Sequence, residues 1–165
     1  MIRAVLAVLV AVALLATALP PLEAARVQST HEEFGSIARE LTRTAAELES
    51  ESTAVTDREL AARTTVRFRL PQGFGTAPLD TAAIGCPSVV LDVAQADTQG
   101  CNAALVYRIR GDDATVRRFP GADLRAPNGP LRLSDSLVRL RLRYVRVGNA
   151  SVVELVEAGS IGTET

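Results

Sequence analysis

Residues 137–157 read LVRLRLRYVRVGNASVVELVE, two runs of alternating apolar and polar residues on either side of a short polar stretch. Alternation with a period of two is typical of a β-strand with one buried face. A turn at Gly148 and Asn149 places apolar residues opposite each other and arginine opposite glutamate. These pairs are Val145–Val152, Leu142–Leu155 and Arg143–Glu154. Because such pairs stabilise neighbouring strands, the stretch predicts an antiparallel hairpin.

The same period appears in shorter segments upstream. TTVRFRL at 64–70 places Val66, Phe68 and Leu70 on one face and Arg67 and Arg69 on the other. AALVYRIR and ATVRRF lie on either side of Gly111-Asp112, which fits the two-residue type II′ turn of a hairpin because glycine comes first. The sequence therefore predicts an antiparallel β domain over residues 64–158.

Arg139, Arg141 and Arg143 alternate along one strand and so share a face. The favoured interpretation is a solvated sheet face that Glu154 and its neighbours neutralise. The alternative is a surface that binds an acidic glycan, lipid headgroups or a partner. This second interpretation requires that the arginines have no carboxylate neighbours in the fold.

Residues 22–52 contain an apolar stripe with helical spacing, formed by Val27, Phe34, Ile37, Leu41 and Leu48. The stripe predicts an amphipathic helical stalk. The stalk either packs on the sheet of its own domain or binds a helix of a partner protein. Residues 53–63 are interpreted as a linker and residues 159–165 as a disordered tail. A helix followed by antiparallel strands predicts the α+β class.

The first residues are strongly apolar, with sixteen uncharged residues from Ala4 to Leu19 behind Arg3. This run is longer than most signal-peptide cores and shorter than the ~20 residues of a typical membrane-spanning helix. Residues 1–21 are interpreted as an N-terminal transmembrane helix that anchors the protein. A signal peptide cleaved near Ala16-Thr17-Ala18 is the alternative. Either interpretation places the C-terminal domain outside the cytoplasm, and the first places it at the cell membrane with a single pass.

Cys86 and Cys101 are the two cysteines of the chain. An extracytoplasmic domain can keep a disulfide between them. This bond requires that residues 79–84 pair with residues 103–110, which makes 87–100 a loop closed at its base. If residues 88–94 form the partner strand instead, the two cysteines lie too far apart for a disulfide. The first pairing is preferred because it uses both cysteines.

Asn149-Ala150-Ser151 matches the acceptor pattern for N-glycosylation. The predicted position of Asn149 at a hairpin tip would make it accessible to a transferase. Asn149 is therefore a candidate glycosylation site.

The sequence favours neither catalysis nor nucleic-acid binding. The chain holds one histidine, His31, and carries 18 cations against 19 anions. A nucleic-acid-binding domain usually has a basic excess. No nucleophile motif, phosphate-binding loop or metal-ligand spacing is present, so we expect no enzyme activity, no cofactor, no metal site and no small-molecule substrate.

The segments MIRAVLAVLVAVALLATALP, VRFRLP, ALVYRIRG, ADLRAPNGPL and RLRLRYVRV together resemble a family of short haloarchaeal membrane proteins of unknown function. The resemblance implies one N-terminal membrane segment and an association with type IV pilus-like assembly genes. The order of parts is also similar to that of a type IV pilin. The chain departs from many pilins because its apolar segment has no glutamate near the start.

The predicted function is therefore structural. We expect a membrane-anchored extracytoplasmic protein with an assembly role, accessory to a pilus-like system, whose partners are the membrane and a protein bound through the helical stalk. The alternative is a secreted or tethered module that binds a glycan or another ligand. A concave pocket with convergent polar groups would favour the module, and an exposed apolar patch on the helix would favour assembly.

Overall fold

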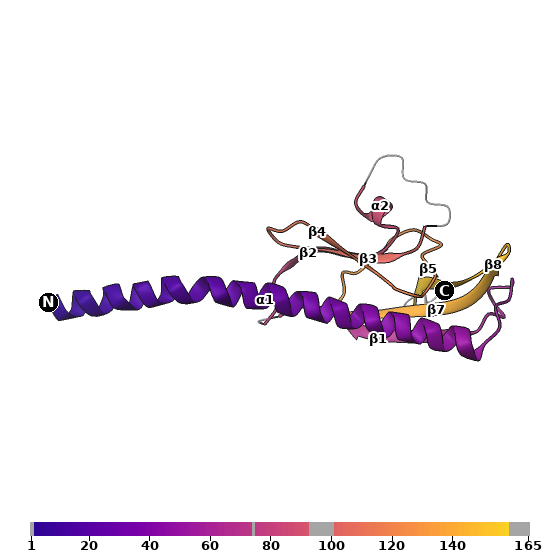
Figure 1. The fold of residues 1–165 in the computed structure, drawn as a ribbon, viewed down its shortest axis with the longest axis horizontal. Coiled ribbons are helices and arrows are strands. Elements are labelled where there is room, and N and C mark those ends of the chain that lie inside the picture. The colour runs from indigo at the N-terminus through magenta and orange to yellow at the C-terminus, as the bar shows by residue number, and fades with distance from the viewer. Residues whose placement is uncertain (1, 74, 93–100, 159–165) are drawn as a thin grey trace, which may run out of the picture.

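A computed structural model of the chain describes residues 2–73, 75–92 and 101–158 (Figure 1). Within these residues, a long helix leads into strands and one short helix. They are α1 (Ile2–Glu51), β1 (Arg63–Arg69), β2 (Leu79–Gly85), α2 (Pro87–Val90), β3 (Ala104–Ile109), β4 (Ala114–Arg118), β5 (Leu124–Arg125), β6 (Leu131–Arg132), β7 (Leu137–Val147) and β8 (Ala150–Glu157). The predicted tail, residues 159–165, lies outside the described residues.

The described strands form two four-stranded sheets. Sheet A has the order β1-β7-β8-β5 and sheet B the order β4-β3-β2-β6. Neighbouring strands are antiparallel except for β5, which runs parallel to β8. The fold is therefore an α+β mix with two sheets, where the sequence predicted one small sheet.

The hairpin of β7 and β8 has the predicted register. Val145 pairs with Val152, Arg143 with Glu154 and Leu142 with Leu155. Gly148 adopts a positive φ of 60°, which a type II′ turn needs at its first central residue. The prediction for this hairpin is confirmed.

The turn between β3 and β4 differs from the prediction. Arg108 pairs with Ala114, and the Asp112 N–H donates to the Ile109 carbonyl. Arg110 and Gly111 are therefore the central residues, with Gly111 second and at a φ of 87°. A type II turn needs a positive φ at this second position, so the glycine fixes the turn one residue earlier than predicted.

The inner faces of the two sheets and one side of α1 form the main core. Sheet A contributes Leu140 and Leu155, sheet B contributes Leu105 and Tyr107, and α1 contributes Phe34, all at most 1% exposed. Ile37 and Leu41 of the predicted stripe are also buried, and Val27 and Leu48 are partly buried. The stripe therefore packs against the protein's own sheets and is not available to a partner.

The predicted transmembrane helix over residues 1–21 is wrong. Among the residues that the structure describes, no helix combines the length and the apolar character that crossing a bilayer requires. The uncharged run of sixteen residues covers roughly 24 Å as a helix, less than a ~30 Å hydrocarbon core. The chain forms one helix through Pro20 and Pro21, so anchor and stalk are not separate elements.

Candidate functional site

The N-terminal part of α1 projects beyond both sheets (Figure 1). Its apolar side chains are open to solvent, with exposed fractions of 63% for Leu6, 62% for Val8 and Leu9, 52% for Val10 and 58% for Val12. Successive residues of an α-helix differ by about 100° in direction, so these five side chains point to several sides of the helix. We call residues 6–12 the apolar end. Its apolar surface is not confined to one stripe.

A buried contact fixes α1 to the sheets. The ring of Phe34 stacks on Tyr107 of β3 with centroids 4.0 Å apart and planes 19° from parallel. His31 Nδ1 lies 2.6 Å from the Tyr107 hydroxyl. The Thr30 hydroxyl donates to the Arg26 carbonyl and accepts from the Ala77 N–H. His31 therefore has a structural partner, and α1 has a defined position on the two-sheet domain, which we call the head.

The outer face of sheet A carries two rows of arginine. In β1 these are Arg63, Arg67 and Arg69, and in β7 they are Arg139 and Arg141, all exposed. Arg67 stands directly opposite Arg139 in the register of the two strands. None of the described carboxylates forms an ion pair with these five residues. We call them the arginine face.

Arg143 lies on the same face but has a carboxylate partner. Its Nη2 is 3.2 Å from Oε2 of Glu154, and Arg58 Nη2 is 2.9 Å from Oε1 of the same carboxylate. Hydrogen bonds and the charge of Glu154 raise the pKa of Arg58 above its ordinary value. Glu154 is 2% exposed, and both of its carboxylate oxygens accept hydrogen bonds from these two arginines. We call this arrangement the clamp. The requirement for an anion-binding face is met at Arg139 and Arg141 and not at Arg143.

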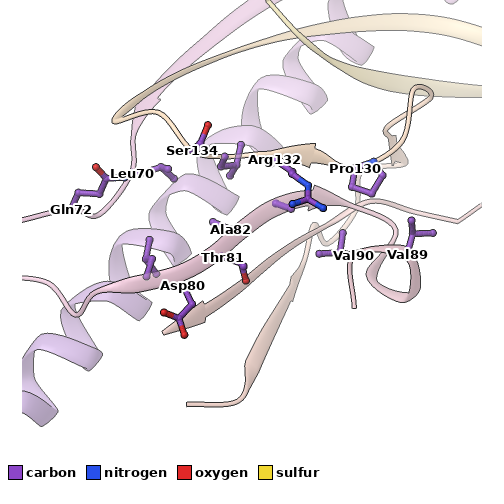
Figure 2. A pocket seen from close by; sticks show the side chains of 13 residues that line it. Leu70, Gln72, Asp80, Thr81, Ala82, Val89, Val90, Pro130, Arg132 and Ser134 are labelled. Atoms are coloured by element: carbon purple, nitrogen blue, oxygen red, sulfur yellow. The ribbon is translucent and has the colours of Figure 1, made fainter. Parts of the chain in front are cut away.

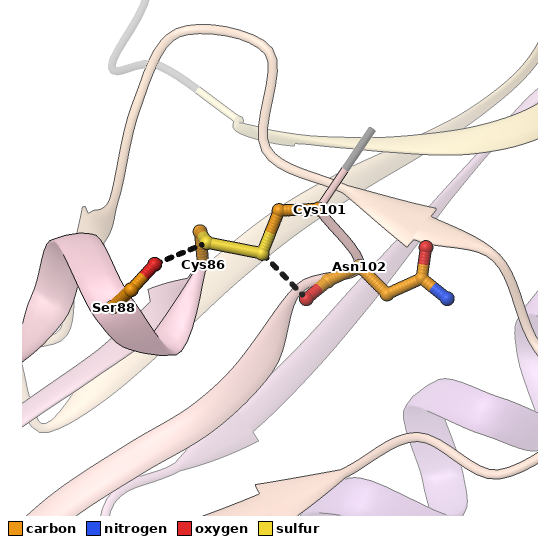
Figure 3. Close-up of a disulfide and its surroundings, with 4 residues drawn as sticks. All are labelled: Cys86, Ser88, Cys101 and Asn102. Carbon is orange, nitrogen blue, oxygen red and sulfur yellow. Dashed lines mark hydrogen bonds between the residues drawn. A yellow bond between two sulfur atoms is a disulfide. The ribbon is translucent and has the colours of Figure 1, made fainter. Parts of the chain in front are cut away.

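The two cysteines lie together at one end of sheet B (Figure 3). They form a disulfide with a Cα–Cα distance of 5.7 Å, and the Ser88 hydroxyl lies 3.0 Å from Cys86 Sγ. β2 pairs with β3, which confirms the strand pairing that the disulfide requires. Within the enclosed loop, α2 follows Cys86 directly. The polar residues 95–100 of the predicted loop lie outside the described residues.

Asn149 is exposed and occupies the two-residue turn between β7 and β8. This is the position at the hairpin tip that the sequence predicted. Its side chain is accessible, and its glycosylation stays a prediction.

A cavity of about 590 Å³ lies beside β2 and β6 (Figure 2). The polar ends of Gln72, Asp80 and Ser134 do not converge on one point in this view. Asp80 is also engaged by Arg110, 3.3 Å away. Thr81 and Arg132 add two more polar side chains to the lining, and the remaining lining residues, Val89 and Val90 among them, are apolar. The alternative of a ligand-binding module stays a prediction.

Across the described part of the chain, no group of three histidine, cysteine or acidic residues is close enough to hold a metal ion. The sequence placed Arg67 and Arg69 on one face of their strand, and Arg139 and Arg141 on one face of theirs, but it did not predict that the two strands are neighbours. The alternation in TTVRFRL was the signal that an equivalent row existed in β1.

No curated protein and no solved structure is significantly similar to the chain. The model of one protein family matches residues 1–158. The chain therefore belongs to the family described as Domain of unknown function (DUF7311).

Proposed function

We propose that this protein has a structural role outside the cytoplasm, as a subunit of an assembly held together by the apolar end of α1. The observation that carries the proposal is the exposure of Leu6, Val8, Leu9, Val10 and Val12 on several sides of one helix. A helix that is apolar all round is stable when it is buried all round. One partner covers only one side, so burial requires several neighbours.

The occupants that fit this surface are the apolar ends of other copies of the chain. Identical apolar helices can pack side by side and exclude water from all sides of each other. The head, fixed through Phe34 and Tyr107, then lies outside the helical bundle. The order of helix and sheet domain is similar to that of a type IV pilin, and on this ground we propose a pilus-like assembly.

The disulfide supports the extracytoplasmic location. Disulfides persist in oxidising compartments and are rare in a reducing cytoplasm. The bond between Cys86 and Cys101 lies at the end of a strand pair and closes a loop, as structural disulfides do. The predicted position at the cell membrane stays a prediction.

Sedimentation velocity of the purified full chain, with and without a mild detergent, tests the assembly. We expect wild-type protein to sediment as a large species without detergent. Leu9→Glu introduces a charge into the apolar end and should shift the protein to the monomer. Leu60 is 78% exposed on the segment between α1 and β1, so Leu60→Glu is the matched control and should behave as wild type. A monomeric wild-type protein at all concentrations would contradict the proposal.

The arginine face supports a second candidate function, binding of an acidic polymer. Five arginines that share one face and have no ion-pair partner among the described residues attract a repeating anion, and the guanidinium fork suits carboxylate and sulfate groups. The chain as a whole carries one more anion than cations, so this positive charge is local. We propose an acidic polysaccharide as the ligand class.

Binding to immobilised alginate and heparin tests this candidate. We expect retention that weakens with added salt. The double variant Arg67→Gln/Arg139→Gln should elute at clearly lower salt. Arg110→Gln, which removes an exposed arginine from the β3–β4 turn, should elute like wild type. Equal elution of all three proteins would exclude the arginine face as the binding surface.

A further inference from the structure

A second cluster of arginines lies away from both surfaces, where α1 passes β4. Gly35 is buried on the helix, and the guanidinium groups of Arg117 and Arg39 lie above it. A Cβ built on Gly35 would stand 3.4 Å from Arg117 Nη1 and 3.6 Å from Arg39 Nη1. Both Nη1 atoms are therefore close to one point. A cavity of about 550 Å³ opens there, lined also by Ala38, Thr42 and Pro120.

The strand register explains how Arg117 reaches the helix. Arg117 pairs with Leu105, and Thr115 pairs with Tyr107. Leu105 and Tyr107 lie on the face of sheet B that meets α1, since Tyr107 stacks on Phe34. Arg117 therefore extends under the helix. Its Nε is buried, and no atom of the described residues accepts a hydrogen bond from it.

No carboxylate lines this cavity to neutralise the two arginines. Arg43 stands at its edge and is already engaged, with Nη2 2.7 Å from Glu40 and Nη1 2.8 Å from Glu47. Neither Arg39 nor Arg117 forms an ion pair with any described residue. Two like charges thus lie near each other, one on the half-buried Arg117 and one on the exposed Arg39, and water screens the charge of Arg117 less than at the open surface.

We propose that Gly35, Arg39 and Arg117 form a binding site for an oxyanion, either free or carried as a phosphate, sulfate or carboxylate group by a small molecule. An oxyanion between the two guanidinium groups accepts charge-assisted hydrogen bonds from both and offsets their repulsion. A Cβ at Gly35 would be in ordinary van der Waals contact with both guanidinium groups, so both lie directly on the helix surface at this point. The site is independent of the apolar end and of the arginine face.

Nuclear magnetic resonance titration of the ¹⁵N-labelled full chain tests the site. Sodium phosphate, sulfate and acetate are each added at constant ionic strength, with chloride as the reference anion. We expect at least one oxyanion to shift the Gly35 amide and the Arg117 Nε–Hε signals saturably. Saturation by phosphate or sulfate alone indicates a tetrahedral group, and saturation by acetate indicates a carboxylate.

Two variants decide whether the shifts belong to this site. Arg117→Gln should weaken binding about tenfold or more, as followed by the Gly35 amide, because a charged donor is lost. Arg39→Gln should also weaken it, because the second guanidinium donor beside Gly35 is removed. Ser36→Ala changes an exposed neighbour and should bind like wild type.

Three results would overturn the proposal. They are shifts that grow linearly without saturation, shifts that chloride reproduces, and shifts that persist unchanged in both Arg117→Gln and Arg39→Gln.

Discussion

At the scale of single residues, Glu154 connects three parts of the chain. Its carboxylate binds Arg143 on the neighbouring strand and Arg58 in the segment between α1 and β1. That segment lies over Val145 and Val152 and forms a small second apolar cluster with them. The ion pairs and this cluster together hold residues 52–62 against sheet A.

Glu154→Gln should therefore destabilise the fold. Removing the charge leaves the largely buried Arg143 without its anionic partner, which costs several kcal/mol at a fully buried site. The Arg58 side chain is 53% exposed and can rehydrate, so we expect a loss of about 2 kcal/mol. Urea unfolding measures this loss. Glu157→Gln, at an exposed position of the same strand, should leave the midpoint almost unchanged, and equal midpoints for both variants would contradict the role of the clamp.

Local sequence patterns predict the contact partners of some of these residues and not of others. The cross-strand pair Arg143–Glu154 follows from the hairpin alone, so it could be predicted. Arg58 belongs to a segment with no period of its own, and its place on Glu154 depends on a contact between distant parts of the chain. The partner of His31 is equally distant, since Tyr107 is 76 residues away.

At the scale of elements, the pairing of β1 with β7 brings like charges together. Arg67 faces Arg139 directly, and like charges at such positions destabilise a sheet. The fold retains this cost on an exposed face where uncharged residues are tolerated, as Thr65 shows. An unfavourable charge pair that a fold keeps in this way is typical of a surface that binds a ligand.

Arg67→Thr should accordingly stabilise the protein. We expect a gain of about 0.5 kcal/mol at low ionic strength, because a like-charge pair is removed and threonine suits a strand. The gain should shrink as salt screens the charges. Arg108→Thr is the matched control, since Arg108 is exposed on a strand opposite Ala114. Thermal or urea unfolding at two salt concentrations measures both, and a loss of stability in Arg67→Thr would contradict the argument.

The loop between β2 and β3 depends on its disulfide. Cys86 and Cys101 are separated by 15 positions, and closing a loop of this size restricts the unfolded chain. The double variant Cys86→Ser/Cys101→Ser should lose about 3 kcal/mol of unfolding free energy. A reducing agent should lower the unfolding midpoint of wild type and leave the variant unaffected. Identical midpoints of the wild type with and without the reducing agent would show that the bond adds no stability.

At the scale of the whole molecule, the sequence predicted elements better than their arrangement. The period of two identified the strands of 64–70 and 137–157, and the period of 3.6 identified the stripe from Phe34 to Leu41. Neither period says that β1 pairs with β7 or that the strands divide into two sheets. Those pairings depend on contacts between distant segments, which local patterns do not encode.

The candidate surfaces, too, could be predicted from the sequence only in part. The apolar end could be predicted from composition, but its interpretation as a membrane span was wrong because the run is short for that role. Arg139 and Arg141 could be placed on one face, whereas the rest of the arginine face required the position of β1. The contact of Arg117 with Gly35 required the packing of a helix against a distant strand.

The uninterrupted course of α1 from Ile2 to Glu51 has a mechanical consequence. The same helix carries the apolar end and packs against the head through Phe34. Each residue of an α-helix adds a fixed rise and a fixed rotation, so the apolar end has a fixed distance from the head and a fixed orientation relative to it. Any assembly that forms through the apolar ends would therefore fix the distance and the rotation angle between neighbouring heads.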